Sequence, residues 1–85
     1  MSLTIRYFAS VREKLGSQEA VELSALASPT VGALHDWLTQ RSDAHAAALS
    51  PERGLRTACN QALCDADQAL ADGDEVAFFP PVTGG

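Results

Sequence analysis

The sequence predicts an α+β fold in which a mixed β-sheet is covered on one face by one main helix. Three observations support this prediction. Apolar residues recur at every second position in residues 3–8 and again in residues 75–79, and they recur at three and four positions in the segment after Thr30. The shorter period is typical of a strand with one buried face, and the longer period is typical of an amphipathic helix.

The first strand is expected over residues 3–8. Its alternation places three side chains on one buried face: Leu3, Ile5 and Tyr7. Residues 11–15 can form a short helical turn, which Gly16 ends. A second strand is expected over residues 18–23. Two apolar residues of this strand share a side: Val21 and Leu23.

The clearest helix begins after Thr30, whose hydroxyl can cap the free backbone N–H groups of the first turn. Its apolar stripe consists of Val31, Leu34 and Leu38, with Trp37 at the edge. A second helical piece is expected over residues 43–49. It ends before Pro51, because the residue that precedes a proline disfavours helix.

The sequence pattern in the last third of the chain predicts three strands. Residues 55–59 and 62–64 form a hairpin, and a turn over residues 70–74 leads to the final strand at residues 75–79. Strands that flank one crossing helix and return to the same sheet describe the β-grasp fold. We expect a single β-grasp domain over residues 1–79, followed by an extended tail over residues 80–85.

The two cysteines, Cys59 and Cys64, are too few for a disulfide framework and lack the spacing of a zinc site. We expect them to serve as small buried side chains. A turn centred on Gln61 and Ala62 would place them opposite each other. Asn60 and Gln61 are the better centre, because asparagine tolerates the left-handed backbone of a tight hairpin. That register separates the two thiols.

The composition is that of an ordinary globular domain, with 46% hydrophobic residues and 11 acidic against 6 basic side chains. A net charge of −5 argues against nucleic-acid binding, which needs clustered positive charge. No apolar segment approaches the length of a membrane span, and the first residues lack the pattern of a signal peptide. We expect a cytoplasmic protein whose partners are other proteins, not nucleic acid or membrane.

No catalytic or metal-binding pattern stands out within the domain. His35 and His45 have no carboxylate or cysteine at ligand spacing, and the acidic segment at residues 72–75 lacks the ligand pattern of a calcium loop. The sequence also lacks the common phosphate-cradling, nucleophilic and zinc motifs. We expect this chain to bind no metal and no cofactor.

Two aromatic residues, Phe8 and Phe79, are expected on the sheet face away from the helix, because each alternates with a buried neighbour. If the first and last strands are neighbours, the two rings form one apolar patch rimmed by Arg6 and Arg12. Such a patch is typical of a partner-binding site. Leu63 extends it if the hairpin register allows. A twist or bulge at a strand end would instead bury either ring at the edge of the core.

The sequence ends in FFPPVTGG. Pro80 and Pro81 stiffen the backbone, so the six tail residues can extend up to about 20 Å at ~3.3 Å per residue. Gly84 and Gly85 lack side chains and can enter a channel too narrow for other residues. The reactive group is the Gly85 carboxylate, an anion at neutral pH that needs activation before a nucleophile attacks its carbon. A frayed, inert terminus is the alternative.

Four segments of the chain resemble the small subunits of molybdopterin synthase, which are ubiquitin-like sulfur carriers. The segments are YFASVRE at residues 7–13, PTVGAL at 29–34, CNQAL at 59–63 and LADGDEVAFFPPVTGG at 70–85. They span the whole chain in the order of that family. The last segment is the most specific, because ubiquitin-like modifiers in general share only the two glycines.

The resemblance implies a ubiquitin-like β-grasp fold and a role in molybdenum cofactor biosynthesis. An adenylating, E1-like enzyme would use ATP to activate the carboxylate of Gly85, and a sulfur-delivery protein would help convert it to a thiocarboxylate. The tail would then enter the large synthase subunit. Two carrier turnovers would supply the two sulfurs that convert cyclic pyranopterin monophosphate to the dithiolene of molybdopterin. The synthase of this family is a heterotetramer, and its small subunit is not catalytic alone.

The resemblance assigns the reactive end to Gly84 and Gly85. It also implies contact between the large subunit and seven residues: Phe8, Leu63, Phe79, Pro80, Pro81, Val82 and Thr83. Three other functions stay open from the sequence. They are a sulfur carrier of another pathway, such as the shorter thiamine-type carriers, a modifier that forms isopeptide bonds through Gly85, and an interaction module with an inert tail.

Overall fold

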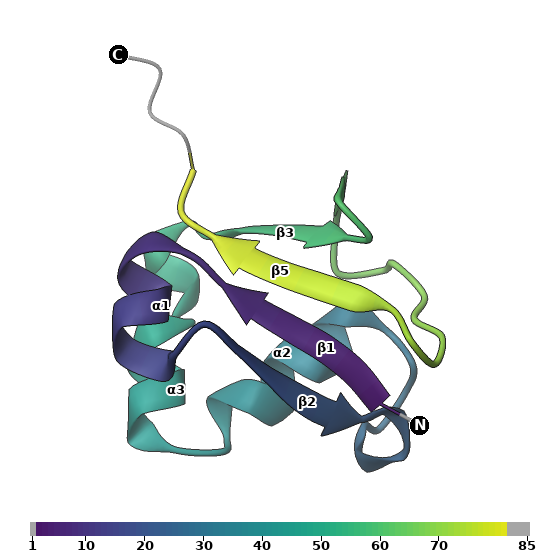
Figure 1. The fold of residues 1–85 in the computed structure, drawn as a ribbon. Helices are drawn as coiled ribbons and strands as arrows, with labels where there is room; N and C mark the ends of the chain where they lie inside the picture. The colour runs from purple at the N-terminus through teal and green to yellow at the C-terminus, as the bar shows by residue number, and fades with distance from the viewer. Residues whose placement is uncertain (1, 82–85) are drawn as a thin grey trace.

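The computed structural model describes residues 2–81, which form a five-stranded mixed sheet with three α-helices. The strands are β1 (Ser2–Tyr7), β2 (Gln18–Glu22), β3 (Arg56–Cys59), β4 (Ala62–Cys64) and β5 (Glu75–Phe79). The helices are α1 (Ala9–Leu15), α2 (Val31–Thr39) and α3 (Asp43–Ala48), and the 3₁₀ turns are η1 (Leu23–Ala25) and η2 (Pro51–Arg53). Figure 1 shows α2 and α3 behind the sheet, with the opposite sheet face toward the viewer.

The strand order in the sheet is β2-β1-β5-β3-β4. The first and last strands of the chain, β1 and β5, are parallel neighbours, with Ile5 opposite Val76 and Tyr7 opposite Phe78. The other neighbouring pairs are antiparallel. The predicted mixed sheet is therefore confirmed. The condition under which Phe8 and Phe79 form one patch, that the first and last strands are neighbours, is also met.

The core lies between the sheet and the helices. The predicted inner face of β1 is buried, as is the predicted stripe of α2: Leu3, Ile5, Tyr7, Val31, Leu34 and Leu38. Val76 and Phe78 of β5 complete the layer from the sheet side. Thr30 caps α2 as predicted, because its Oγ1 accepts a hydrogen bond from the backbone N–H of Ala33 at 3.2 Å.

The β3–β4 hairpin has the predicted turn. Asn60 and Gln61 both adopt positive φ angles, of 50° and 70°, which gives the left-handed turn that matches the twist of the strands. Cys59 therefore pairs with Ala62 rather than with Cys64, and both thiols are free. Burial raises the pKa of each thiol, so both stay protonated at neutral pH.

Five elements differ from the sequence prediction at one or both ends. β1 covers residues 2–7 rather than 3–8, α3 ends at Ala48 rather than at residue 49, and β3 begins at Arg56 rather than at residue 55. α1 begins at Ala9, two residues before the predicted turn, because a positive φ of 52° at Ala9 turns the chain sharply out of β1. β2 ends at Glu22, so Leu23 lies in η1 rather than in the strand. Leu23 still packs against the core, because a tight turn and a strand can each direct it inward.

Candidate functional site

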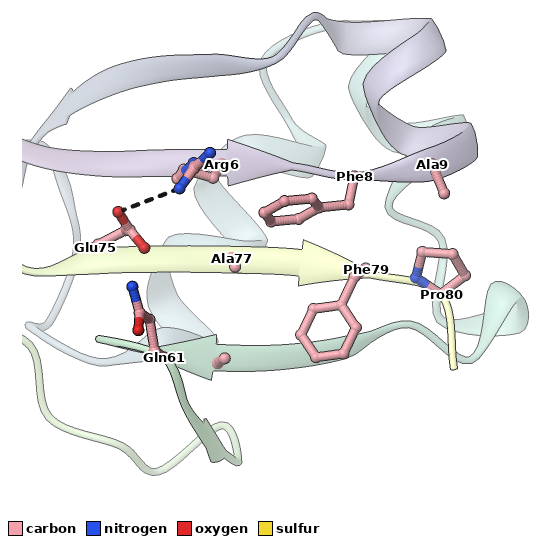
Figure 2. A pocket seen from close by; sticks show the side chains of 9 residues that line it. Arg6, Phe8, Ala9, Gln61, Glu75, Ala77, Phe79 and Pro80 are labelled. Atoms are coloured by element: carbon pink, nitrogen blue, oxygen red, sulfur yellow. Dashed lines mark ion pairs between the residues drawn. The ribbon is translucent and has the colours of Figure 1, made fainter. Parts of the chain in front are cut away.

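The outer face of the sheet brings Phe8 and Phe79 together. Tyr7 pairs with Phe78 on the inner face, so the next residue of each chain segment points outward and the two are adjacent. Figure 2 shows both rings on the same side of the sheet. Phe8 is 37% exposed and Phe79 is partly exposed. The predicted outward direction of both side chains is correct.

The two rings border a hollow of about 590 Å³ on this outer face. The floor consists of Ala77 on β5 and Ala58 on β3, which pair directly across the two strands. Sequence reasoning missed this floor, because single alanines carry no signal and only the strand register places them together. The full lining is Arg6, Phe8, Ala9, Ala58, Gln61, Glu75, Ala77, Phe79 and Pro80.

Leu63 lies on the same outer face. It pairs with Ala58 across the β3–β4 hairpin, and paired residues of neighbouring strands share a face. Its side chain is 68% exposed, the most exposed large apolar side chain in residues 2–81. The Asn60 turn therefore sets the register that extends the apolar patch beyond the hollow.

Arg6 forms one end of the hollow. Its Nη1 lies 3.8 Å from a carboxylate oxygen of Glu75, and its guanidinium carbon lies 5.3 Å from the centre of the Phe8 ring. Figure 2 shows the ion pair beside the Phe8 ring. A cation above an aromatic face is attracted by the ring electrons, so Arg6 helps to hold Phe8 in place. Arg12, also predicted at the rim, is exposed on α1 and does not line the hollow.

The backbone around Phe8 is fixed by the fold. The N–H of Phe8 donates to the carbonyl of Phe78 at 3.3 Å, which continues the β1–β5 ladder by one residue. Its own carbonyl accepts from the N–H groups of Val11 and Arg12 at the start of α1. Phe8 therefore joins a strand to a helix, and the ring projects from a rigid corner.

The hollow is continuous with the root of the predicted tail. β5 ends at Phe79, and the next residue, Pro80, is part of the lining. Pro81 is the last residue that the structure describes. The other predicted tail residues lie outside the described residues: Val82, Thr83, Gly84 and Gly85.

The side chains of the two histidines make polar contacts within the domain. His35 Nε2 lies 2.7 Å from the carbonyl oxygen of Leu49, and His45 Nε2 lies 3.0 Å from a carboxylate oxygen of Glu19. Residues 2–81 contain no group of three or more metal-ligating side chains that could hold an ion. In the same part of the chain, no helix has the length and apolar character needed to cross a membrane.

Comparison with known proteins settles the family. The family model described as "ThiS family" matches residues 5–85. The chain belongs to the ThiS family. Within it, the molybdopterin synthase sulfur carrier subunit of Escherichia coli (strain K12) is 48% identical over 83 residues, which cover 98% of this chain and 99% of the relative. The corresponding subunit of Haemophilus influenzae (strain ATCC 51907 / DSM 11121 / KW20 / Rd) is 43% identical over 84 residues, which cover 98% of this chain and 99% of that relative.

Solved structures show the same fold for this ThiS family chain. SAMP1 from Haloferax volcanii superposes with a TM-score of 0.74 at 30% identity, over 100% of both chains. A putative molybdopterin converting factor, subunit 1, from Pyrococcus furiosus gives a TM-score of 0.77 at 26% identity, over 96% of this chain and 99% of that chain. The predicted ubiquitin-like β-grasp fold is confirmed. The full-length matches above also place the chain among the molybdopterin synthase sulfur carrier subunits.

Proposed function

We propose that this chain carries sulfur as a thiocarboxylate on Gly85 and delivers it inside molybdopterin synthase. One observation supports the proposal most. The exposed apolar hollow reaches Pro80, the first residue of the tail, in a chain that matches a molybdopterin synthase sulfur carrier subunit over 99% of that subunit's length. The proposed docking surface thus adjoins Pro80, from which the sequence continues for five residues to the proposed reactive end.

The chemistry begins with activation, because a carboxylate is a poor acyl donor. A carboxylate oxygen of Gly85 attacks the α-phosphorus of ATP on an E1-like partner enzyme, and pyrophosphate leaves. The terminal sulfur of a persulfide on a delivery protein then displaces AMP from the acyl adenylate, which gives an acyl disulfide. A thiol cleaves the S–S bond of this intermediate, so Gly85 ends as a thiocarboxylate and the thiol ends in a disulfide with the delivery protein. Because this loading needs ATP, we propose a cytoplasmic location for the protein.

Delivery takes place in the large synthase subunit. The thiocarboxylate sulfur forms a bond to a side-chain carbon of cyclic pyranopterin monophosphate, and an oxygen substituent of that carbon leaves. Water then hydrolyses the acyl carbon–sulfur bond of the thioester, which returns Gly85 to its carboxylate form and leaves the sulfur on the pterin. Two such turnovers complete the dithiolene of molybdopterin. The chain contributes the reacting carbon and its delivery, while the residues that bind the phosphorylated pterin belong to the large subunit.

Docking on the large subunit uses the outer face of the sheet. We define the docking face as Phe8, Leu63, Phe79 and Pro80, together with the hollow that Phe8, Phe79 and Pro80 border. Pro81, Val82 and Thr83 continue from it toward the reactive end. A Helicobacter pylori structure, described as a complex of subunits 1 and 2 of molybdopterin-converting factor, contains a chain of the same fold with a TM-score of 0.67. The resemblance to the small subunits of molybdopterin synthase implies the assembly that we propose, in which two copies of this chain bind a large-subunit dimer as a heterotetramer.

Intact mass spectrometry of the protein from its own cells tests the carrier chemistry. We expect a fraction of the chain to show the mass increase for one oxygen replaced by one sulfur, located to Gly85 by fragmentation. Treatment with a thiol-alkylating reagent should modify this fraction at the C-terminus. A chain that carries only oxygen at Gly85 during active cofactor synthesis would contradict the proposal.

A second candidate function is protein modification through Gly85. It is favoured by the 30% identity to SAMP1 of Haloferax volcanii, which is described as small archaeal modifier protein 1. Isopeptide formation would use the same adenylated Gly85, with a lysine amine in place of the sulfur nucleophile. Digestion of cell extracts and a search for lysines that carry a C-terminal remnant of this chain would reveal it.

A further inference from the structure

The hollow on the docking face exists because two residues in one row of the sheet are small. Arg6, Ala77 and Ala58 are direct partners across β1, β5 and β3, and Ala58 pairs in turn with Leu63 on β4. The residues at the two ends of this row are long, whereas the two in the middle end at Cβ. The middle of the row is therefore the floor of a depression in an otherwise raised surface.

The two sides of this depression differ in chemistry. Phe8, Phe79 and Pro80 form the side nearest the tail, and Arg6, Glu75 and Gln61 form the opposite side, as Figure 2 shows. An apolar wall and an alanine floor favour an apolar occupant, because burying apolar surface is favourable without the need for polar partners. The polar side lies where the rim of an interface meets water.

We propose that the hollow is a socket for a bulky apolar side chain of the large subunit, and that Ala58 and Ala77 determine which large subunits fit. This inference rests on the proposed function. Interfaces take much of their affinity from a few anchors that fill well-packed pockets near the centre of the contact. The hollow has the position of such a pocket, between Phe8, Phe79 and the root of the tail.

The occupant is the partner that receives the tail. Pro80 is both a wall of the hollow and the residue that follows β5, so a protein that holds the tail also covers the hollow. A second copy of this chain is disfavoured, because each copy carries a net charge of −5 and the copies repel each other.

Titration of the large subunit with Ala77 variants tests the socket. Ala77→Leu fills the floor, and we expect the dissociation constant to rise by about 10- to 100-fold, in line with the cost of overpacking. Valine is smaller than leucine and is well accommodated in a strand, so Ala77→Val should raise the dissociation constant less. Ala77→Ser should leave the dissociation constant near the wild-type value. Ala20→Leu is the matched control. Ala20 is on β2, where it pairs with Thr4 of β1. It lies on the same sheet face as Ala77 but does not line the hollow.

The outcomes separate the socket from the proposed function. Thermal unfolding is measured for each variant, and only variants that keep the fold are compared in binding. If wild type binds the large subunit and both Ala77→Leu and Ala77→Val bind equally well, the socket is wrong and the carrier function stands. If wild type itself does not bind, the docking part of the proposed function is wrong as well. If Ala77→Leu alters only self-association in sedimentation, the occupant is a second copy and the socket for the large subunit is overturned.

Discussion

At the residue scale, Phe79 is the side chain that links the hollow to the tail. It borders the hollow, stands beside Phe8 and directly precedes Pro80. We predict that Phe79→Asp weakens binding to the large subunit by at least about 30-fold, because truncating a central aromatic anchor typically costs ~2 kcal/mol or more and the new carboxylate loses its hydration. Isothermal titration of the folded variant measures this change.

Ala46→Asp provides the control for Phe79→Asp. Ala46 is exposed on α3, away from the outer face of the sheet, so the same charge added there should leave the affinity almost unchanged. Equal affinity of Phe79→Asp and wild type would remove Phe79 from the docking face.

Glu19 holds three parts of the fold together on the inner side of the sheet. Its carboxylate accepts a hydrogen bond from the Tyr7 hydroxyl at 2.7 Å, lies 3.0 Å from His45 Nε2 and is paired with Arg41. Burial alone would raise the pKa of Glu19. The hydrogen bonds from His45 and Tyr7, together with the charge of Arg41, outweigh burial and hold this pKa below its usual range.

This lowered pKa predicts how stability depends on pH. A carboxylate with a lower pKa in the folded than in the unfolded state stabilises the fold above the unfolded pKa, and that contribution disappears as the pH falls through the folded pKa. We expect Glu19→Gln to lower the free energy of unfolding by about 1–2 kcal/mol at neutral pH, since hydrogen bonds to charged groups are lost. It should also flatten the loss of stability in acid.

Urea unfolding of wild type and Glu19→Gln from neutral to acidic pH measures both effects. The two curves should converge at low pH, where the carboxylate of the wild type is protonated. Glu13→Gln, on the exposed surface of α1, should follow the wild type throughout. Parallel curves for wild type and Glu19→Gln would show that Glu19 does not supply the pH dependence.

At the element scale, the start of α1 depends on an unusual backbone angle. Ala9 has a φ of 52°, in the left-handed region that glycine occupies without steric cost. We predict that Ala9→Gly leaves the stability unchanged or raises it by up to about 1 kcal/mol, because relief of strain offsets the greater freedom of the unfolded chain. By contrast, Ala46→Gly within α3 should cost about 1 kcal/mol. Chemical unfolding compares the two, and equal losses would contradict the strain at Ala9.

The elements that the sequence predicted well are those with local chemical causes. Thr30 caps α2 through a side chain next to the helix, and Asn60 permits the hairpin turn through its own backbone preference. Leu23 was misplaced because strand and 3₁₀ turn both satisfy the same apolar spacing. The early start of α1 was missed because alanine gives no signal for a positive φ.

The candidate site was also predictable only in part. The outward direction of Phe8 and Phe79 follows from alternation along each strand, so it was predictable from the sequence. The floor of the hollow was not, because it depends on how β3 and β5 pair. Outside the candidate site, the Glu19 contacts on the inner side of the sheet were also missed, since Arg41 and His45 are 22 and 26 positions away in the chain.

At the scale of the whole molecule, the two faces of the sheet have different roles: one contributes to the core and the other carries the proposed docking face. The inner face packs against the helices, and the outer face bears the apolar hollow. β5 is the third of five strands in the sheet order, so the tail leaves from the middle of the sheet rather than from an edge. A partner on the outer face can therefore surround the root of the tail and fix the direction in which Gly85 is presented.

This arrangement predicts a strict limit on the length of the tail. The docking face fixes the root, and the activated carbon must reach the reaction centre, so one alanine added after Gly85 displaces the terminal carbon by about 3.3–3.6 Å. We expect this variant, and also Gly84→Val, to abolish molybdopterin formation in a reconstituted reaction, while binding to the large subunit and thermal stability stay close to wild type. One alanine inserted after Met1 is the matched control and should keep full activity. An extended variant that forms molybdopterin at the wild-type rate would show that the terminal carbon of Gly85 is not the site of sulfur transfer.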